Sequence, residues 1–261
     1  MADVSRIALA VVLVALILLG PALAPYDPAE PVTAPWQAGS AGHFLGGDVL
    51  GRDVLSRVLS GGRHLLVVSL VAAMAATLAG TLGGLAAGWG GYRLLAAGAD
   101  LLLAMPVLLP ALVLAVSLPG DTAVVAATVL AGAPLTLGVV RDTVAGVRER
   151  GYVRAARLRG ERTPAVLLRE VLPAVAGVLA ADLGLRFVTA LQLASALAVL
   201  GLTDAPATGD WAAMLRENLA GAALNPAALA APALLLALLS LAIAAAAHIG
   251  LGHAFGTGDA W

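Results

Sequence analysis

The side chains that could do chemistry are few, and one pair stands out by its setting. Asp182 and Arg186 lie four residues apart inside a long apolar segment. An ionised group at the depth of a bilayer is costly unless it is paired or faces water, so the pair is a candidate intramembrane site. An acid and a base at this spacing also neutralise each other on one helix face, which would be a purely structural role. Both interpretations stay open at this point.

The chain offers no convincing nucleophile or metal site. It has no cysteine, and Ser40 lacks the strand-to-helix context that exposes and activates a serine. His248 and His253 are five residues apart, so a helix turns them away from a common face. His43 and His64 have no histidine or carboxylate partner at ligand spacing. We therefore predict no catalytic residue, no metal and no cofactor in this chain.

The fifteen basic residues are all arginine. A nucleotide-binding P-loop requires a lysine that reaches the phosphates, so this chain carries no such motif. If ATP is used, ATP and Mg²⁺ would have to bind to partner subunits. The formal net charge of −1 also gives no basic footprint for nucleic acid.

The composition is that of an integral membrane protein. Hydrophobic residues make up 61% of the 261 positions, charged residues 12%, and the mean hydropathy is +0.96. The apolar segments predict an all-α fold of six transmembrane helices in one domain, residues 1–261. The expected spans are 6–24, 64–89, 94–118, 122–140, 174–200 and 227–249. A secretory signal peptide that ends near Ala24 is the rival interpretation of the first segment.

Two of the expected spans contain residues that predict a kink or a helix–helix interface. Pro106 and Pro110 remove backbone donors in the third span and predict a kink there. In the second span, small residues recur every four positions and predict a close helix–helix interface, within the chain or with a partner. These residues are Ala72, Ala76, Gly80, Gly84 and Gly88.

A charged segment at 141–173 interrupts the apolar runs and holds eight of the fifteen arginines. The positive-inside rule makes it cytoplasmic, and six spans then place both termini on the cytoplasmic side. Gly160 is expected to take a positive φ and end a short helix, with Thr163 and Pro164 as the N-cap and first residue of a second. The two helices would form a compact knob that leads into the fifth span, with Arg148 outside it.

Two stretches resemble the permeases of ABC importers. In the charged segment, an Ala-Ala pair, a glycine four residues later and a Leu-Pro pair at the end resemble the EAA loop, which docks on a cytoplasmic ATPase. The residues concerned are Arg154, Ala155, Ala156, Arg157, Gly160, Leu172 and Pro173. Before the second span, a run resembles the dipeptide, oligopeptide and nickel branch of these permeases. Its matching residues are Gly51, Arg52, Asp53, Ser56 and Arg57.

The resemblance implies a type I ABC importer permease fold that forms half of a translocation pathway for peptides or a related small solute such as a nickel complex. It also implies a homologous second permease, two ABC ATPase subunits, an extracytoplasmic substrate-binding protein and a place in the lipid bilayer of the cell membrane. The coupling residues would be those of the EAA-like loop. Transport would follow an alternating-access cycle.

Two departures and two rival classes accompany this resemblance. Arg154 stands where the EAA name has an acidic residue, and Ala194 stands where many relatives have a glutamate. A substrate or gating role of that carboxylate is therefore not carried over. An ion-coupled secondary transporter would work without ATPase subunits, and an intramembrane enzyme would need a nucleophile with a base. Identification of the proteins that purify with the chain would separate these classes.

Overall fold

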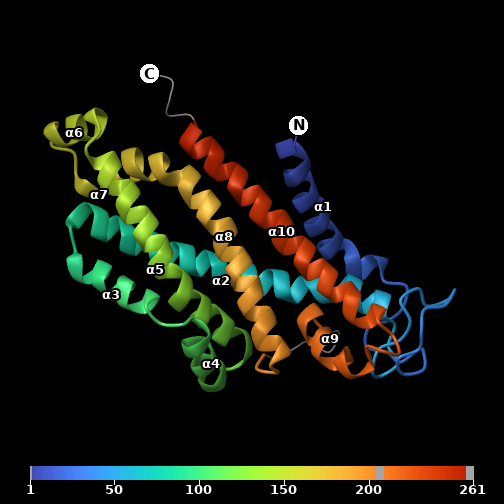
Figure 1. The fold of residues 1–261 in the computed structure, drawn as a ribbon. Helices are drawn as coiled ribbons and strands as arrows, with labels where there is room; N and C mark the ends of the chain where they lie inside the picture. Colours follow the sequence, from blue (N-terminus) through green and yellow to red (C-terminus); the bar gives the residue numbers. More distant parts are fainter. Residues whose placement is uncertain (1, 204–208, 257–261) are drawn as a thin grey trace.

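The structure is a computed structural model that describes residues 2–203 and 209–256. The named secondary-structure elements of the described part are all helices, and the segment 24–53 between α1 and α2 is irregular (Figure 1). In chain order the elements are α1 (Ala2–Leu23), α2 (Val54–Gly90), α3 (Arg93–Leu103), α4 (Leu108–Ser117), α5 (Gly120–Arg148), α6 (Gly151–Leu158), α7 (Thr163–Val166), the π-helix η1 (Leu167–Val171), α8 (Leu172–Val199), α9 (Trp211–Asn218), the 3₁₀ helix η2 (Leu219–Gly221) and α10 (Ala227–Gly256).

Four helices in the described part are long and apolar enough to cross a membrane: α2, α5, α10 and the continuous helix Thr163–Val199. The bent pair α3 and α4 makes a fifth crossing if it is counted as one broken span. The helix α1 packs against α10 and α2, with Leu13 and Ile17 buried. The result is a long bundle with α6 and α7 at one end and α9 with the segment 24–53 at the other (Figure 1).

The helix α2 begins ten residues before the expected start of the second span, at Val54 rather than His64. Asp53 causes this early start, because its side chain accepts a hydrogen bond from the backbone N–H of Ser56 and caps the helix. The expected polar loop is therefore shorter than the sequence indicated. The residues from Val54 onward, including Ser56 and Arg57, are helical.

The third expected span is two helices rather than one. The helix α3 ends at Leu103 and α4 begins at Leu108, and the two are bent by 91°. Pro106 lies in the break, where it removes a backbone donor and disfavours helix at the residue before it. Pro110 lies in the first turn of α4, where a proline costs little. The expected kink is thus a complete break.

The stripe of small residues in α2 packs against α5 within the chain. Ala72 and Ala76 are fully buried. A Cβ at Gly84 would lie 2.6 Å from Val140 Cβ, and one at Gly88 would lie 2.8 Å from the backbone oxygen of Arg141. Side chains at these glycines would force the two helices apart, so the glycines set the α2–α5 distance.

The second short helix of the expected knob runs into the fifth span without interruption. Its N-cap is Arg162 rather than Thr163, because Thr163 already has helical geometry. Pro173 has no N–H to donate one turn back, and the helix changes just before it to a π pattern in which the N–H of Leu172 bonds to the oxygen of Leu167. The Leu172-Pro173 pair therefore lies within a continuous helix and does not end one.

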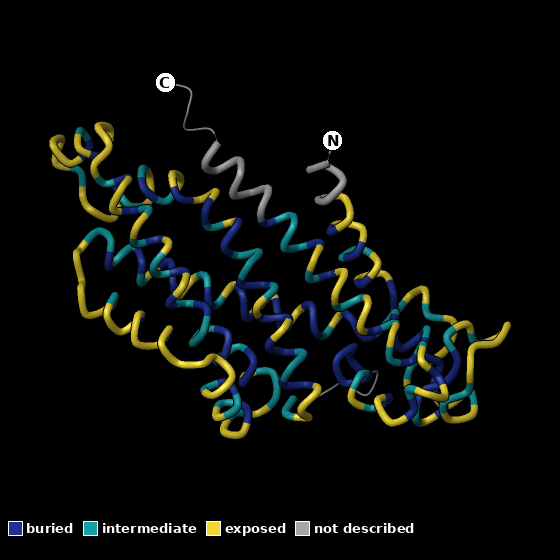
Figure 2. Tube along the Cα trace, in the orientation of Figure 1, coloured by how far each residue is buried: buried dark blue, intermediate teal, exposed yellow. Residues whose placement is uncertain are grey.

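Buried apolar side chains form two clusters. The larger joins α1, α2, α4, α5, α8, α9 and α10, and the smaller joins the end of α5 with α6, α7, η1 and the start of α8. Figure 2 shows the buried positions on the inner faces of the helices, while α3 is largely exposed. Leu94 and Leu101 on α3 are 88% and 70% exposed. Such an apolar outer surface fits a lipid environment rather than water.

Candidate functional sites

The structure brings Asp182 and Arg186 together near the middle of α8. Arg186 Nε lies 3.3 Å from Asp182 Oδ1, and both side chains are more than nine-tenths buried. Asp182 also accepts a hydrogen bond of 2.6 Å from the hydroxyl of Thr136 on α5. The carboxylate is thereby drawn towards α5. Gly132 of α5 makes room for the arginine, since a Cβ there would lie 3.2 Å from Arg186 Cδ.

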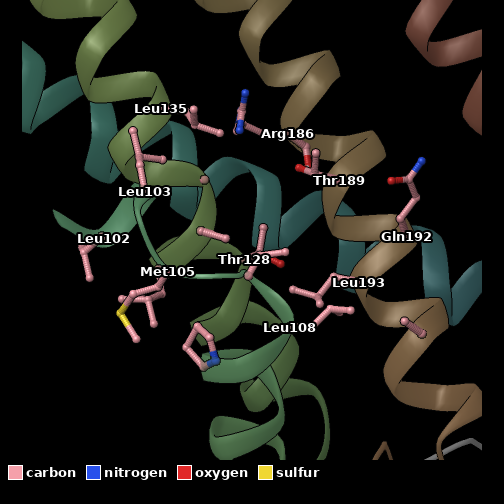
Figure 3. A pocket seen from close by; sticks show the side chains of 16 residues that line it. Leu102, Leu103, Met105, Leu108, Thr128, Leu135, Arg186, Thr189, Gln192 and Leu193 are labelled. Atoms are coloured by element: carbon pink, nitrogen blue, oxygen red, sulfur yellow. The ribbon is translucent and has the colours of Figure 1, made fainter. Parts of the chain in front are cut away.

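A cavity of about 520 Å³ adjoins this pair, between the α3–α4 break, α5 and α8 (Figure 3). Most of its wall is apolar. Its polar lining residues are Thr128, Arg186, Thr189 and Gln192. Arg186 is the one charged residue among the described residues that line the cavity, because Asp182 faces Thr136 instead.

Two polar groups of the cavity wall have donor capacity that the described residues do not use. Arg186 Nε and Thr128 Oγ1 are buried, and neither has a hydrogen-bond partner in the described part of the chain. The hydroxyl of Thr189 donates to the backbone oxygen of Arg186 and keeps its lone pairs free to accept. Both of these atoms are shielded from solvent, so the polar groups that the wall offers to a ligand are the other guanidinium nitrogens of Arg186, Thr189 and Gln192.

A cluster of three buried charges and one half-buried acid, Glu217, joins the start of α2 to α9. We call it the α2–α9 ion cluster: Asp48, Arg52, Arg57 and Glu217. Asp48 accepts from both arginines, with a distance of 2.7 Å to Arg52 Nε. Glu217 accepts from Arg52 Nη2 at 2.8 Å and from Arg57 Nη1 at 2.9 Å. Arg57 is fully buried. Two predicted family residues therefore hold together segments that lie 160 positions apart.

The other residues of the Gly51–Arg57 run shape the same region. Asp53 caps α2 and lies 3.0 Å from His43 Nδ1, and its second oxygen accepts from the hydroxyl of Ser56. That hydroxyl in turn accepts from the backbone N–H of Tyr26. Gly51 has a φ of +75°, a left-handed conformation that glycine adopts at little cost. The run thus builds a fixed turn and a helix start.

His43 and His64 have carboxylate partners in space that lie outside the sequence spacing of metal ligands. His43 pairs with Asp53, and His64 Nε2 lies 2.9 Å from Asp121 with Asp210 4.0 Å from its other nitrogen. Asp121 and Asp210 are far from His64 in the sequence, which hid these contacts. Within the described residues, no three histidine, cysteine or acidic side chains are grouped so that they could hold a metal. The side chains of His248 and His253 lie outside the described residues.

The region around α6 has the two short helices of the expected knob, but Ala156 does not lie on its surface. Gly160 has a φ of +77°, and two backbone bonds close the helix end: Gly160 N–H to Arg157 and Glu161 N–H to Ala156. Ala156 is fully buried against α5 and α7, so it packs inside and is not a docking surface, whereas Ala155 is half-buried. A Cβ at Gly160 would meet nothing within 4 Å. Leu158 beside it is 88% exposed.

Trp89 at the end of α2 ties this knob to the bundle. The guanidinium carbons of Arg148 and Arg157 lie 5.8 and 5.5 Å from the centre of its indole ring. Arg148 also donates a 2.9 Å hydrogen bond to the backbone oxygen of Trp89. Cation–π contacts of this kind are modest but directional. Arg148 lies at the end of α5, outside the knob as expected, and meets the knob residue Arg157 only through this shared ring.

Sequence reasoning missed several residues of these sites. Glu217 completes the α2–α9 ion cluster, Asn218 accepts from the N–H of Val49, and Asn225 donates to the backbone oxygens of Leu45 and Gly47. Their one signal was polarity in a short segment between two apolar runs. Thr136 and Trp89 gave no signal, because a threonine or tryptophan in or near a span is common.

The fold and the sites define a class: a polytopic helical membrane protein with a mid-bundle cavity. The sequence profile of the family described as "Binding-protein-dependent transport system inner membrane component" matches residues 72–249. This chain belongs to that family. It is thus the permease component of a binding-protein-dependent transport system.

Relatives with assigned names match most of this chain. It is 35% identical to the di/tripeptide transport system permease protein of Pseudomonas aeruginosa, over 76% of this chain and 69% of the relative. It is also 35% identical to the glutathione transport system permease protein of an Escherichia coli strain, over 77% of this chain and 67% of the relative. The protein of that name from Pectobacterium atrosepticum is 31% identical over 68% and 60%.

Proposed function

We propose that this chain is one of two permease subunits of an ATP-driven importer for short peptides. The observation that carries the substrate class is the similarity to permeases named for di- and tripeptides and for glutathione, itself a tripeptide. The cavity and the buried pair on α8 would lie along the path of the substrate.

In this proposal the chain crosses the membrane six times. Four long helices and the broken pair α3–α4 supply five crossings. The helix α1 would be the sixth: its apolar part, Ala8–Leu23, is about 24 Å long, and the whole helix of 22 residues is about 33 Å long. The arginine-rich segment 141–173 would then be cytoplasmic together with both termini, and α9 with the segment 24–53 would be extracytoplasmic.

The knob around α6 would bind one of two ATPase subunits. Arg154, Arg157, Arg159 and Arg162 are exposed there, and exposed arginines suit acidic grooves on a partner. ATP and Mg²⁺ would bind to the ATPases, because this chain has no lysine for a P-loop. An extracytoplasmic binding protein would deliver the peptide, and a second, homologous permease would complete the pathway.

The continuous helix from Thr163 to Val199 suggests how ATP hydrolysis would move the pathway. It begins in the knob and carries Asp182 and Arg186 near its middle. A displacement of the knob would tilt this helix as a rigid element and shift the pair relative to α5. That is a rigid-body form of alternating access.

The test is purification of the tagged chain from its own cells, followed by reconstitution of whatever copurifies with it into proteoliposomes. We expect ATPase subunits and a second permease, and uptake of labelled dialanine that requires ATP and the binding protein. Uptake driven by an ion gradient without ATPases would favour a secondary transporter and contradict the proposal. Chemical conversion of the peptide without uptake would favour an enzyme.

A further inference from the structure

We propose that the cavity between the α3–α4 break, α5 and α8 binds a carboxylate through Arg186. Given the proposed function, that carboxylate is the C-terminal group of a short peptide. The inference goes beyond the family assignment, because it names a site inside this one chain and the chemical group that the site recognises.

The guanidinium of Arg186 is the group that would bind the carboxylate. Arg186 can donate five N–H groups in a planar fork that matches a carboxylate. Its Nε is close enough to Asp182 for an ion pair, yet it has no hydrogen-bond partner among the described residues. The other carboxylate oxygen of Asp182 accepts a hydrogen bond from Thr136. Asp182 therefore balances the charge of Arg186 on the Nε side, while Arg186 lines the cavity and none of the described residues accepts a hydrogen bond from its guanidinium.

The second argument is the composition of the wall around it. The cavity volume of about 520 Å³ lies in the range of small-ligand sites. Thr189 and Gln192 supply polar groups on the α8 side, and Thr128 lies in the α5 wall with its hydroxyl shielded (Figure 3). An apolar wall with a few polar groups and one cation suits an amphiphilic anion such as a small peptide.

The third argument is electrostatic. Asp182 compensates the charge of Arg186 from the side of α5 but does not line the cavity. Among the described residues that line the cavity, a bound carboxylate would therefore meet one cation and no acid. In a site of low dielectric constant, charge-assisted hydrogen bonds to a guanidinium are strong enough to discriminate a free carboxylate from an amide.

The experiment uses the natural absence of cysteine. Thr189→Cys places a single thiol in the cavity wall, and its alkylation by N-ethylmaleimide is timed in the full chain, alone in lipid nanodiscs and with its copurified partners. Dialanine is expected to slow the alkylation, and dialanine amide should require about tenfold higher concentration for the same effect, the ratio of one charge-assisted hydrogen bond. Ala38→Cys, in the exposed segment 24–53, is the control and should show no protection.

A second variant assigns the effect to the arginine. Asp182→Asn with Arg186→Gln, made on the Thr189→Cys background, removes both charges and leaves no uncompensated ion. Free acid and amide should then protect equally. Equal protection by both ligands in the parent Thr189→Cys protein, or protection by neither, overturns the proposal. Since alkylation is read on the chain itself, this result is independent of whether ATP-driven uptake succeeds.

Discussion

The two charged ends of the molecule differ in how far their charged side chains are buried. At the α9 end, the α2–α9 ion cluster turns its charges inward: Arg57 is fully buried, and Asp48 and Glu217 share the same two arginines. At the α6 end, Arg154 and Arg157 are exposed, and the side chain of Arg159 is 61% exposed. The charges of the ion cluster pair with one another inside the chain, whereas the arginines at the α6 end are exposed to the surroundings.

This difference separates residues that build the protein from residues that are available to a partner. Both ends carry family-like motifs, and a motif alone does not tell the two roles apart. Removal of a buried charge leaves its partners unpaired and destabilises the fold. Removal of an exposed charge costs the fold little, and its effect shows in association instead.

The largest effect on the fold is expected from Asp48→Ala. The change leaves Arg52 and Arg57 with Glu217 alone, and breaking a buried pair from one side costs about 3–5 kcal/mol. We predict a strong loss of folded, membrane-inserted protein, measured as the monodisperse fraction in detergent. Glu30→Ala, an exposed acid in the same segment, is the control and should match the wild type. Normal yield of Asp48→Ala would show that the cluster is not structural.

A smaller loss of stability is expected from Asp182→Ala, because one buried arginine is left without its acid. The double change with Arg186→Ala should recover part of the loss, since removing both ions costs less than stranding one. The readout is thermal denaturation of the three variants in detergent. If the single and double variants are equally destabilised, the two residues are not coupled.

A modest effect is expected from Trp89→Ala. It removes the ring that Arg148 and Arg157 contact, and such contacts contribute about 0.5–1 kcal/mol each. The bundle should stay intact while hydrogen exchange becomes faster in α6. Trp89→Phe keeps an aromatic face and serves as the control. Unchanged exchange in α6 would mean that Val153 and Ala156 alone hold the knob.

The sequence supported the helical class, the family and the kinked third span, because these depend on apolar length, motif spacing and proline chemistry. The helix boundaries expected from the sequence were wrong where a helix cap or a change in the backbone hydrogen-bond pattern sets the boundary. Asp53 starts α2 early, and Pro173 lies within a helix because a π segment accommodates it. Hydropathy does not report either effect.

The candidate sites show the same limit. Asp182 and Arg186 were found because their spacing is local, and Gly160 was expected at positive φ because few other residues end a helix that way. Glu217, Thr136 and the partners of His64 were missed because each contact closes a long loop. Sequence spacing has no information on such pairs.

The central claim is that the knob around α6 binds the ATPase, and Gly160 allows a direct test. A Cβ there meets nothing within 4 Å, so a loss of binding beyond that caused by backbone strain points to a clash with a partner. Gly160→Asn tolerates the left-handed backbone and controls for strain, and Gly146→Glu places the same acid at another open glycine.

The measurement is the amount of ATPase that copurifies with equal amounts of inserted permease, together with ATP-driven dipeptide uptake. We predict that Gly160→Glu loses both, that Gly160→Asn retains most of each, and that Gly146→Glu matches the wild type. Normal ATPase binding and uptake by Gly160→Glu would contradict the account.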